Sequence, residues 1–543
     1  MSEDKGIGPY GEWEYGLSED VGSDDLGERE LLDASKIVFD HIAILMSSPA
    51  GTEAAAYMVD IKNVCTNVTI FEDIGSYHLS GRMTIVDGVD IIKNNKLVGQ
   101  ETVTIKAHMV VPSEEEKEGS TAKDPLQLGM DHTFRIYAIS DYTRINDSTA
   151  SYVLHFTDPM AYEFQQTRIN KVLRGRYSDM LALSMQEDAE MKSYLSGKNV
   201  RSGFEKTSPE NMQLVVPNWN LNRLAQFVVE NGDVVDNKSY KNSMFFYQTL
   251  MRTSDNDDRY KLQSFQRMCS DEMKHQEVFS YYGRNDQNPA NTTETFNLRM
   301  TTILSYTKPV KANTLMGVTT GAYASKMVTY DPVRKIHEDV IYSIDDVFSR
   351  QDNNSHVQSH PMIRTNEEGI PLYRLEEYSN EGVEVSEMFR DKNPGTSFND
   401  VILHKVNMTN AYSDEEKLID ASGTTNVQQQ IGLEYRDAGT LERVALLSLM
   451  EQNITRVEIP LRFDMMVGMN VDLILPTAEI KGDNDVPSGD ELESLRYVIG
   501  KLTYEFSPLN QKGRLSMQCI KESFNVNIDE YNPKGEVWSI VMV

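Results

Sequence analysis

The sequence predicts a β-rich protein of the α+β class, in which two β units flank a region that mixes helix and strand. Residues of alternating polarity recur from Ile37 to Phe156, and the alternation returns after Val457. Between these stretches the apolar spacing changes toward the 3.6-residue period of a helix. The chain has 543 residues, too many for one ordinary core, so about three or four domains are expected.

The first β unit is predicted over residues 34–165. Its clearest strand places Val103, Ile105, Ala107 and Met109 on one face and polar residues on the other. The same alternation marks further strands at Phe134, Ile136, Ala138 and at Tyr152, Leu154, Phe156. Between the strand that ends at Met109 and the strand at Phe134, the segment from Pro112 to Asp131 is polar and carries three consecutive glutamates, which predicts an inserted loop. Several short strands at this spacing predict a barrel or a sandwich.

A middle region of mixed helix and strand is predicted over residues 166–348. One helix is expected through Leu181, Leu183, Met185 and Met191, and another through Leu224, Phe227 and Val228. Asn220 is the expected N-cap of the second helix, because its side chain can accept a hydrogen bond from a first-turn N–H, and Gly232 is its expected end. Strands are expected at Met244 to Tyr247, Thr301 to Tyr306 and within 330–344.

The second β unit is predicted over residues 431–530. A polar insertion or connector over 349–430 precedes it, and a helix through Leu441, Val444, Ala445 and Leu449 begins it. Its strands are expected at Val457 to Leu461, Val471 to Leu475, Tyr497 to Phe506 and Leu515 to Cys519. The acidic loop 477–493 is expected to be solvated, and residues 531–543 form a C-terminal tail.

The charge of the chain limits its partners. The sequence has 53 basic and 83 acidic residues, a formal net charge of -30. Proteins that bind DNA neutralise phosphates with Lys and Arg, so this chain is not expected to bind DNA, although DNA could slide past it without sticking. Residues 1–33 are acidic and glycine-rich, which predicts a flexible arm rather than a signal peptide or a membrane anchor. The three cysteines are far apart and predict no disulfide framework.

The sequence predicts no catalytic residue, metal site or cofactor site, and hence no enzyme. The motifs of serine hydrolases, zinc proteases, P-loop proteins and dinucleotide-binding proteins are absent. Asp483, Asp485 and Asp490 resemble a calcium loop, but Gly489 is misplaced for one, so a solvated loop is the preferred interpretation.

Two histidine-containing segments have alternative interpretations. His356 and His360 have the spacing of metal ligands on a helix, but Pro361 argues against a helix, so a loop with two surface histidines is preferred. His337-Glu338-Asp339 could form an acid/base cluster, but such charges on a strand or short helix usually face water.

Three short strings carry the most specific information. They are Pro217-Asn218-Trp219 before a helix, the aromatic strand Phe245-Phe246-Tyr247, and the turn that contains Gly321 and Tyr323. None of the three contains a catalytic nucleophile, a set of metal ligands or a phosphate-binding loop. We therefore expect them to determine local structure, and they point to a protein that takes part in an assembly. Trp219 is either an interface contact or a core residue beside the turn, and the core is preferred. The structural markers are Pro217, Asn218, Trp219, Phe245, Phe246, Tyr247, Gly321 and Tyr323.

These strings, in their order, resemble the baseplate central hub proteins of contractile-tailed bacteriophages, the myovirus-type tail hub. The N-terminal motifs Phe39-Asp40-His41-Ile42, Val59-Asp60-Ile61, 68–74, 81–87 and Gly99-Gln100-Glu101 resemble the first barrel of that family. The marker strings resemble its middle region, and the helix and strand of 441–461 resemble the entry into its second barrel. The resemblance covers most of residues 35–525.

The resemblance implies a trimer in which each subunit gives two similar β-barrel tube domains to a pseudo-six-fold ring. Such a ring would match a three-fold central spike to a six-fold tail tube and would let DNA pass. The implied partners are further copies of the chain, the tail tube protein, the central spike protein and the baseplate wedge proteins, with no membrane. The implied location is the tail baseplate of the virion, after assembly in the host cytoplasm.

Two alternatives remain. The first is a hub that is fused to, or acts as, a cell-wall-degrading enzyme, which the lack of a convincing acid/base or metal constellation disfavours. The second is a spike-type protein of a related contractile injection system, which would usually carry a long β-helical repeat, and none is present. Under the preferred interpretation, acidic residues lining the bore are a hypothesis.

Overall fold

The structure is a computed structural model that describes most of the chain between residues 36 and 524. The described residues are 36–46, 57–109, 129–187, 200–208, 210, 212–234, 242–251, 259–281, 299–310, 312–331, 336–344, 347, 360–361, 402–406, 432–476 and 494–524. The predicted arm 1–33, the tail 531–543, the acidic loop 477–493 and most of the loop after Pro112 lie outside them. Those expectations stay predictions.

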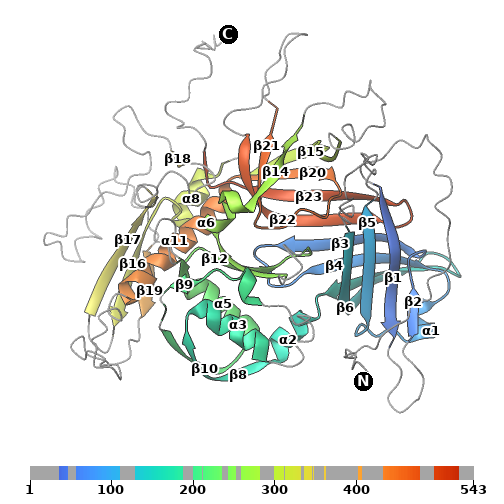
Figure 1. Cartoon of the computed structure of the whole chain (residues 1–543), viewed down its shortest axis with the longest axis horizontal. Helices are drawn as coiled ribbons and strands as arrows, with labels where there is room; N and C mark the ends of the chain where they lie inside the picture. The colour runs from blue at the N-terminus through green and yellow to red at the C-terminus, as the bar shows by residue number, and fades with distance from the viewer. Residues whose placement is uncertain are drawn as a thin grey trace, which may run out of the picture.

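One large sheet runs through the molecule (Figure 1). Among the described residues it has thirteen strands, and its main path is β15-β20-β23-β22-β3-β4-β7-β6-β5-β1-β2. The first unit contributes β1 Ile37–Met46, β2 Tyr57–Asp60, β3 Cys65–Asp73, β4 Ser80–Asp87, β5 Thr102–Met109, β6 Gly129–Arg144 and β7 Ala150–Thr157. The rest are β14 Lys274–Ser280, β15 Ser305–Val310, β20 Ile454–Pro460, β21 Asn470–Ile474, β22 Leu495–Ser507 and β23 Lys512–Ile520.

The first β unit forms as its alternating sequence predicts. Val103, Ile105 and Ala107 of β5 are at most 1% exposed, whereas the residues between them are exposed or half-buried. Every pairing within the unit is antiparallel. The short helix α1 Ile91–Asn95 follows β4. The side chains on one face of this sheet are therefore buried in the core, and those on the other face are exposed or half-buried.

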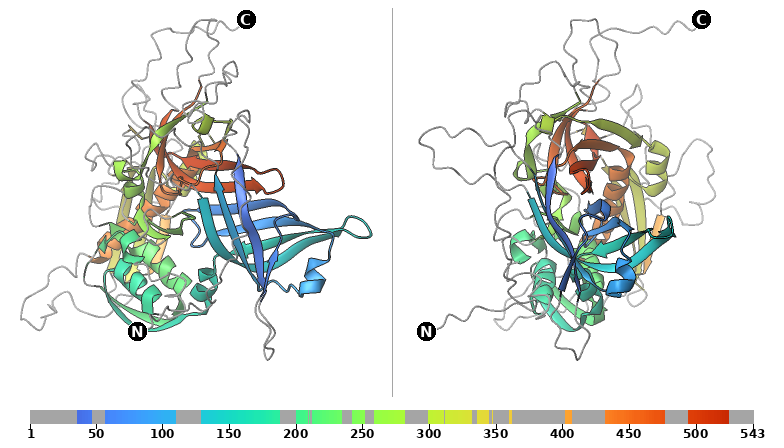
Figure 2. Two further views of the ribbon diagram at one scale, coloured as in Figure 1. Left: turned by 45° about the vertical axis from the view of Figure 1, so that its right-hand side comes forward. Right: turned by 90° about the vertical axis from the view of Figure 1, so that its right-hand side faces the viewer.

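The second β unit contains strands from two distant parts of the sequence. β20, β21, β22 and β23 lie where the alternation after Val457 predicts them. β15 joins the unit by pairing antiparallel with β20, and β14 joins by pairing parallel with β21. Both come from the predicted middle region, so that region also supplies part of this sheet. Figure 2 shows the blue strands of the first unit beside the red strands of the second.

The β-rich α+β class is confirmed, but no closed barrel is found among the described strands. Two isolated bridges approach closure: one joins the first unit to the second, and the other joins the two ends of the second unit. Lys36, before β1, bridges to Lys512 at the β22–β23 turn, and Ser280 of β14 bridges to Thr302 ahead of β15. Closure of a barrel requires a continuous ladder of hydrogen bonds, which these single bridges do not supply.

The middle region has its own hydrophobic core. Around it lie α2 Met160–Gln166, β8 Arg168–Gly175, α3 Tyr177–Glu187, β10 Met212–Asn220, α5 Leu221–Asn231, β12 Met244–Gln248 and β13 Tyr260–Ser264. As predicted, Asn220 caps α5 by accepting a hydrogen bond from the backbone N–H of Arg223 at 3.0 Å, and Gly232 follows its last residue. The first predicted helix ends at Glu187, and Met191 lies outside the described residues.

A second helical layer lies at the other side of the middle region (Figure 1). It contains α8 Thr314–Thr320 and the long helix α11 Gly432–Gln452, beside a small sheet of β17 Ile336–Ser343, β16 Ala324–Asp331 and β19 Ile402–Val406. β19 belongs to the predicted connector 349–430, as does β18 His360–Pro361. Short elements complete the described fold: β9 Thr207–Ser208, β11 Asp233–Val234, α6 Phe265–Met268, β24 Ser523–Phe524 and 3-10 helices Val200–Gly203 and Asp271–Met273.

Candidate functional site at the junction of the β units

The two β units join where β3 pairs antiparallel with β22. In this register Lys501 lies opposite Asp73, and Tyr504 lies opposite Ile70. Opposed residues of an antiparallel pair project to the same side of the sheet, so the seam has one polar and one apolar face. The apolar face belongs to a single hydrophobic core with residues of both units. The seam is therefore a continuation of the sheet rather than a contact between separate domains.

A buried carboxylate, Glu72 of β3, lies on the apolar side of this seam. Its side chain accepts hydrogen bonds from the backbone N–H groups of Val467 at 2.9 Å and Leu250 at 3.1 Å, and from the Tyr504 hydroxyl at 3.3 Å. Burial raises the pKa of Glu72 to about 7, although these three donors act to lower it. Glu72 thus connects the first unit, the second unit and the middle region.

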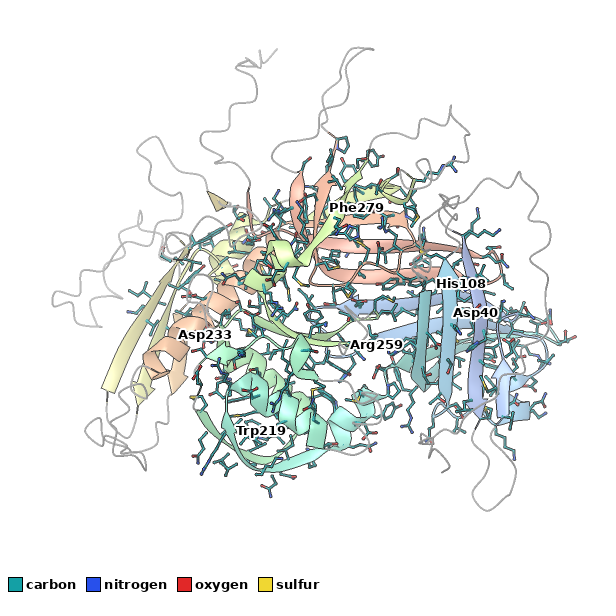
Figure 3. The ribbon with its side chains drawn as sticks, viewed as in Figure 1. Asp40, His108, Trp219, Asp233, Arg259 and Phe279 are labelled. Carbon is teal, nitrogen blue, oxygen red and sulfur yellow. The ribbon has the colours of Figure 1, made fainter. Side chains whose placement is uncertain are left out.

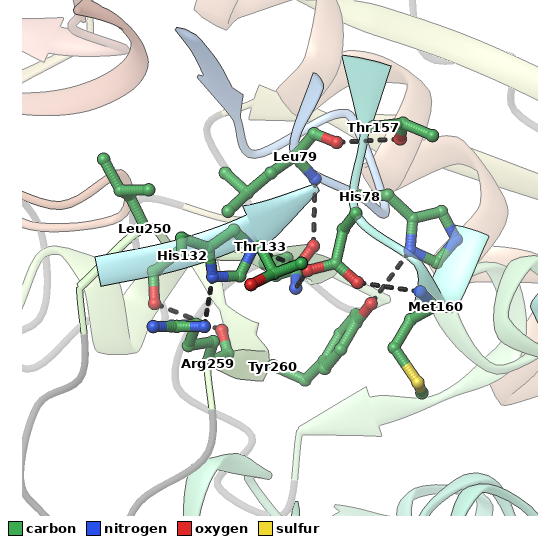
Figure 4. A network of polar contacts seen from close by, with 12 residues as sticks. His78, Leu79, His132, Thr133, Thr157, Met160, Leu250, Arg259 and Tyr260 are labelled. Carbon is green, nitrogen blue, oxygen red and sulfur yellow. Dashed lines mark hydrogen bonds and ion pairs between the residues drawn. The ribbon is translucent and has the colours of Figure 1, made fainter. Parts of the chain in front are cut away.

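A second polar network joins the first unit to the middle region (Figure 4). Asp158, between β7 and α2, accepts hydrogen bonds from Gln248 at 2.7 Å and His132 at 2.9 Å, and from the backbone N–H of Met160 at 2.8 Å. Arg259 donates to the other ring nitrogen of His132. Burial acts to raise the pKa of Asp158, but His132, the Met160 N–H and Gln248 together bring that pKa below its ordinary value.

The His132–Asp158 pair has the composition of two members of a catalytic triad, but its surroundings do not suit catalysis. Both side chains are 5% exposed. The ring nitrogen of His132 that would face a substrate is already bonded to Arg259. A general base must reach the proton that it removes, so the pair is positioned to hold β7, β6 and the middle region together.

The polar face of the seam carries paired charges. Lys501 lies 3.3 Å from Asp73, and Arg514 of β23 lies 2.7 Å from Glu505. We call the residues that the register places on this side of β20, β23, β22, β3 and β4 the junction face. They are Arg456, Glu458, Arg514, Ser516, Gln518, Lys501, Thr503, Glu505, Thr69, Phe71, Asp73, Ser80, Arg82 and Thr84. The junction face carries both signs and does not share the acidic excess of the chain.

The aromatic marker strand lies between the two cores. Phe245 and Tyr247 of β12 belong to the core of the large sheet, whereas Phe246 belongs to the middle core. The hydroxyl of Tyr247 donates to Gln263 at 2.8 Å. Successive side chains of a strand point to opposite faces, so β12 divides and connects the two cores.

The Pro217-Asn218-Trp219 marker forms a bulge in the β8–β10 ribbon. The register shifts between Val216 and Trp219, and Asn218 has a left-handed φ of 54°. Trp219 lies at the edge of the molecule (Figure 3), where its ring packs 5.5 Å from that of Phe227 on α5. The pairing resumes at Trp219 and Asn220, so the bulge shifts the register of the ribbon just before α5 begins.

The third marker is a helix end. Gly321 terminates α8 with a φ of 78°, a conformation that favours glycine. The hydroxyl of Tyr323 donates to Gln452 of α11 at 2.7 Å. The three markers therefore lie in different parts of the molecule and do not converge on one site.

Sequence reasoning missed Glu72 and Asp158. A signal for Glu72 is present, because it falls in phase with Val68, Ile70 and Ile74, which all face the core. A carboxylate at an inward position predicts a buried hydrogen-bonding site. Asp158 lies just beyond a strand, and its partners are distant in sequence, so alternation gives no comparable signal.

The structure describes only some of the other candidate residues that the sequence suggested. His337, Glu338 and Asp339 lie in β17 and His360 lies in β18, in strands rather than helices, and the structure describes only their backbone. His356, Asp483, Asp485 and Asp490 lie outside the described residues.

Two searches of the described part of the chain found no further site. No group of three or more His, Cys, Asp or Glu residues there could hold a metal ion. No helix there is long and apolar enough to cross a membrane.

Comparison with known proteins gives matches to solved structures alone. No family model matches the chain, and no curated protein matches it. The chain is similar to a 43 kDa tail protein of prophage MuSo2 from Shewanella oneidensis, at 8% identity and a TM-score of 0.40, over 89% of this chain and 98% of that one. It is also similar to a tail protein from Neisseria meningitidis MC58, at 7% identity and a TM-score of 0.40, over 89% and 97% of the two chains.

A third similar structure is the half-lidded PdpA-VgrG complex of Francisella. The identity is 9% and the TM-score is 0.40, over 95% of this chain and 62% of the other. Phage tail proteins are the class to which the sequence resemblance points.

Proposed function

We propose that this protein is a structural hub of a phage tail baseplate. Three copies would form a pseudo-six-fold ring that adapts the central spike to the tail tube, contacts wedge proteins outside and lets DNA pass. The observation that carries the proposal is the pairing of β3 with β22, which joins two β units edge to edge within one chain. A ring of six units needs six such junctions, and each chain already contains one.

Isolated bridges between sheet ends support barrel-like tube domains. The bridge from Lys36 to Lys512 joins the start of β1 in the first unit to β23 in the second, and the bridge from Ser280 to Thr302 brings the two ends of the second unit together. Across the second of these seams the rings of Tyr281 and Tyr306 lie 5.1 Å apart, edge to face. Units with joined ends expose few unpaired strand edges, which suits repeated, ordered contact with neighbouring copies.

The junction face is the surface we assign to the bore of the ring. It runs unbroken across the intrachain seam, so its repetition in three copies would give a continuous wall. Several of its charges are paired across strands, as in Lys501 with Asp73 and Arg514 with Glu505. A wall with an excess of cations would hold DNA, because DNA affinity comes from phosphate neutralisation. On the junction face four basic residues stand among three acidic ones, so its near-balanced charge would hold DNA only weakly. The acidic lining expected from the sequence stays a hypothesis.

The proposed role requires no catalysis. The two buried networks, centred on Glu72 and Asp158, connect the β units to the middle region and would keep the wall rigid. In this role the energetics lie in strand pairing and in contacts between subunits. The proposed location is the tail baseplate of the virion, with assembly in the host cytoplasm.

The mass and symmetry of the purified full chain test this function. Light scattering and electron-microscope class averages are expected to show a three-fold ring with an open centre, either alone or after addition of the spike protein. A chain that stays monomeric in the presence of both spike and tube proteins would contradict the proposal and would reopen the search for an enzyme.

A further inference from the structure

The β8–β10 ribbon presents an exposed face at the edge of the middle region (Figures 1 and 3). Its two strands pair antiparallel, and only one side packs on the middle core, through Ile169, Leu173 and Val216. On the outer side, Val172 lies directly opposite Val215, and their exposed fractions are 48% and 64%. Two adjacent exposed valines on a rigid ribbon form a small apolar contact surface.

Basic residues surround this apolar pair. Arg168 and Arg174 are exposed and share its side of β8, four residues before and two residues after Val172. Lys171 is also exposed, whereas β8 and β10 contain no Asp or Glu. A chain with a net charge of -30 thus carries a local cationic surface with an apolar centre.

The sequence contains a segment with the complementary chemistry. Near the N-terminus, Glu12, Trp13, Glu14 and Tyr15 interleave carboxylates with aromatic rings. The rings fit an apolar pair that is flanked by guanidinium groups, because Arg pairs with carboxylates and also stacks on aromatic faces. The surrounding residues 1–33 are strongly acidic, so long-range attraction has the correct sign.

The length of the chain permits this contact. The first described residue, Lys36, follows Trp13 by 23 residues, and about 3.3 Å per extended residue gives Trp13 a reach of roughly 75 Å from that point.

We propose that the outer face of the β8–β10 ribbon binds the acidic aromatic segment around Trp13, from the same chain or from another copy. This inference does not depend on the proposed hub function. Nucleic acid is the less suitable occupant, because three cations on a strongly acidic chain neutralise few phosphates. The contact would give the predicted N-terminal arm a defined position on the middle region.

A disulfide trapping experiment in the full chain tests the contact. The variant Gly11→Cys with Gln213→Cys places one thiol beside the segment and one on the ribbon, and it keeps Trp13 and Val215. The native cysteines Cys65, Cys269 and Cys519 are buried, so they do not compete. Rapid disulfide formation is expected under mild oxidation, within one chain or between two chains.

Two controls make the result decisive. Gly11→Cys with Val98→Cys uses a site that is 71% exposed on the first β unit, and it is expected to react slowly. Charge reversal by Arg168→Glu and Arg174→Glu is expected to slow trapping at Gln213→Cys by about tenfold, since two attractive pairs become repulsive. Equal trapping at both sites, or trapping that charge reversal leaves unchanged, would overturn the proposal.

A gel-shift measurement with duplex DNA tests whether the ribbon binds nucleic acid instead of the N-terminal segment. The full chain is expected not to shift DNA at moderate salt. A shift that disappears in the Arg168→Glu, Arg174→Glu variant would identify the ribbon as a nucleic-acid surface and would also overturn the proposal.

Discussion

Glu72 is the residue at which the three parts of the molecule meet, and its burial has a consequence for stability. The pKa of Glu72 is about 7 in the folded chain, against 4.5 for an ordinary glutamate. A raised folded pKa means that the folded state binds the proton more tightly. The resulting stabilisation is fully present below pH 4.5 and is lost as the pH rises through 7.

We predict that Glu72→Gln removes this pH dependence, because glutamine does not ionise. The unfolding free energy of the native chain is expected to fall by about 3 kcal/mol more than that of the variant between pH 4.5 and pH 8. Urea denaturation at several pH values measures the difference. Glu505→Gln, on the junction face, is the control and should keep the native profile. Parallel profiles for the native chain and Glu72→Gln would show that Glu72 does not titrate in this range.

Asp158 allows a matched comparison between a buried and an exposed pair. Asp158→Ala leaves His132, Gln248 and a backbone N–H without their acceptor, so a loss of about 3–5 kcal/mol is expected. Asp40→Ala removes the partner of His108, 3.3 Å away and exposed (Figure 3), and should cost less than about 1 kcal/mol. Thermal unfolding compares the two variants, and similar losses would show that the Asp158 network is not a structural connection.

At the scale of elements, the cap of α5 gives a further prediction. The Asn220 side chain accepts from the backbone N–H of Arg223 at 3.0 Å, so Asn220→Ala is expected to cost about 1 kcal/mol. Asn220→Asp keeps the acceptor and should recover most of that loss. A shift of the thermal midpoint in the alanine variant alone supports the cap, and equal shifts in both variants would assign the loss to the contact with Gln165.

Local rules predicted these elements well, and long-range pairing was beyond their reach. The cap at Asn220, the helix end at Gly232 and the alternation of β5 depend on neighbours a few residues away. The entry of β14 and β15 into the second β unit depends on strands far along the chain. Glu72 belongs to the same class, because its partners Leu250 and Val467 are remote in sequence. Periodicity contains no information on such partners.

At the scale of the whole molecule, the two β units behave as one body. They share a core, and the ring of Phe39 in β1 lies 5.9 Å from that of Phe506 in β22. The aromatic strand β12 then joins this core to that of the middle region. A force on the middle region would therefore reach both β units together, which suits the proposed role as an adaptor.

The assignment of the junction face to the bore gives the last prediction. Thr503→Cys places a thiol at the centre of that face, and Val98→Cys places one at the exposed turn after α1. Burial raises the pKa of the native thiols of Cys65 and Cys519 to about 12, so they should not react. In the free chain, both introduced thiols should react with a small maleimide and with a polyethylene-glycol maleimide too large to enter the bore. In intact tails, the large reagent should modify Val98→Cys and leave Thr503→Cys unmodified, since it cannot enter a closed ring. Modification of Thr503→Cys by the large reagent in tails with three-fold hubs would place the junction face outside the bore while leaving the hub function intact.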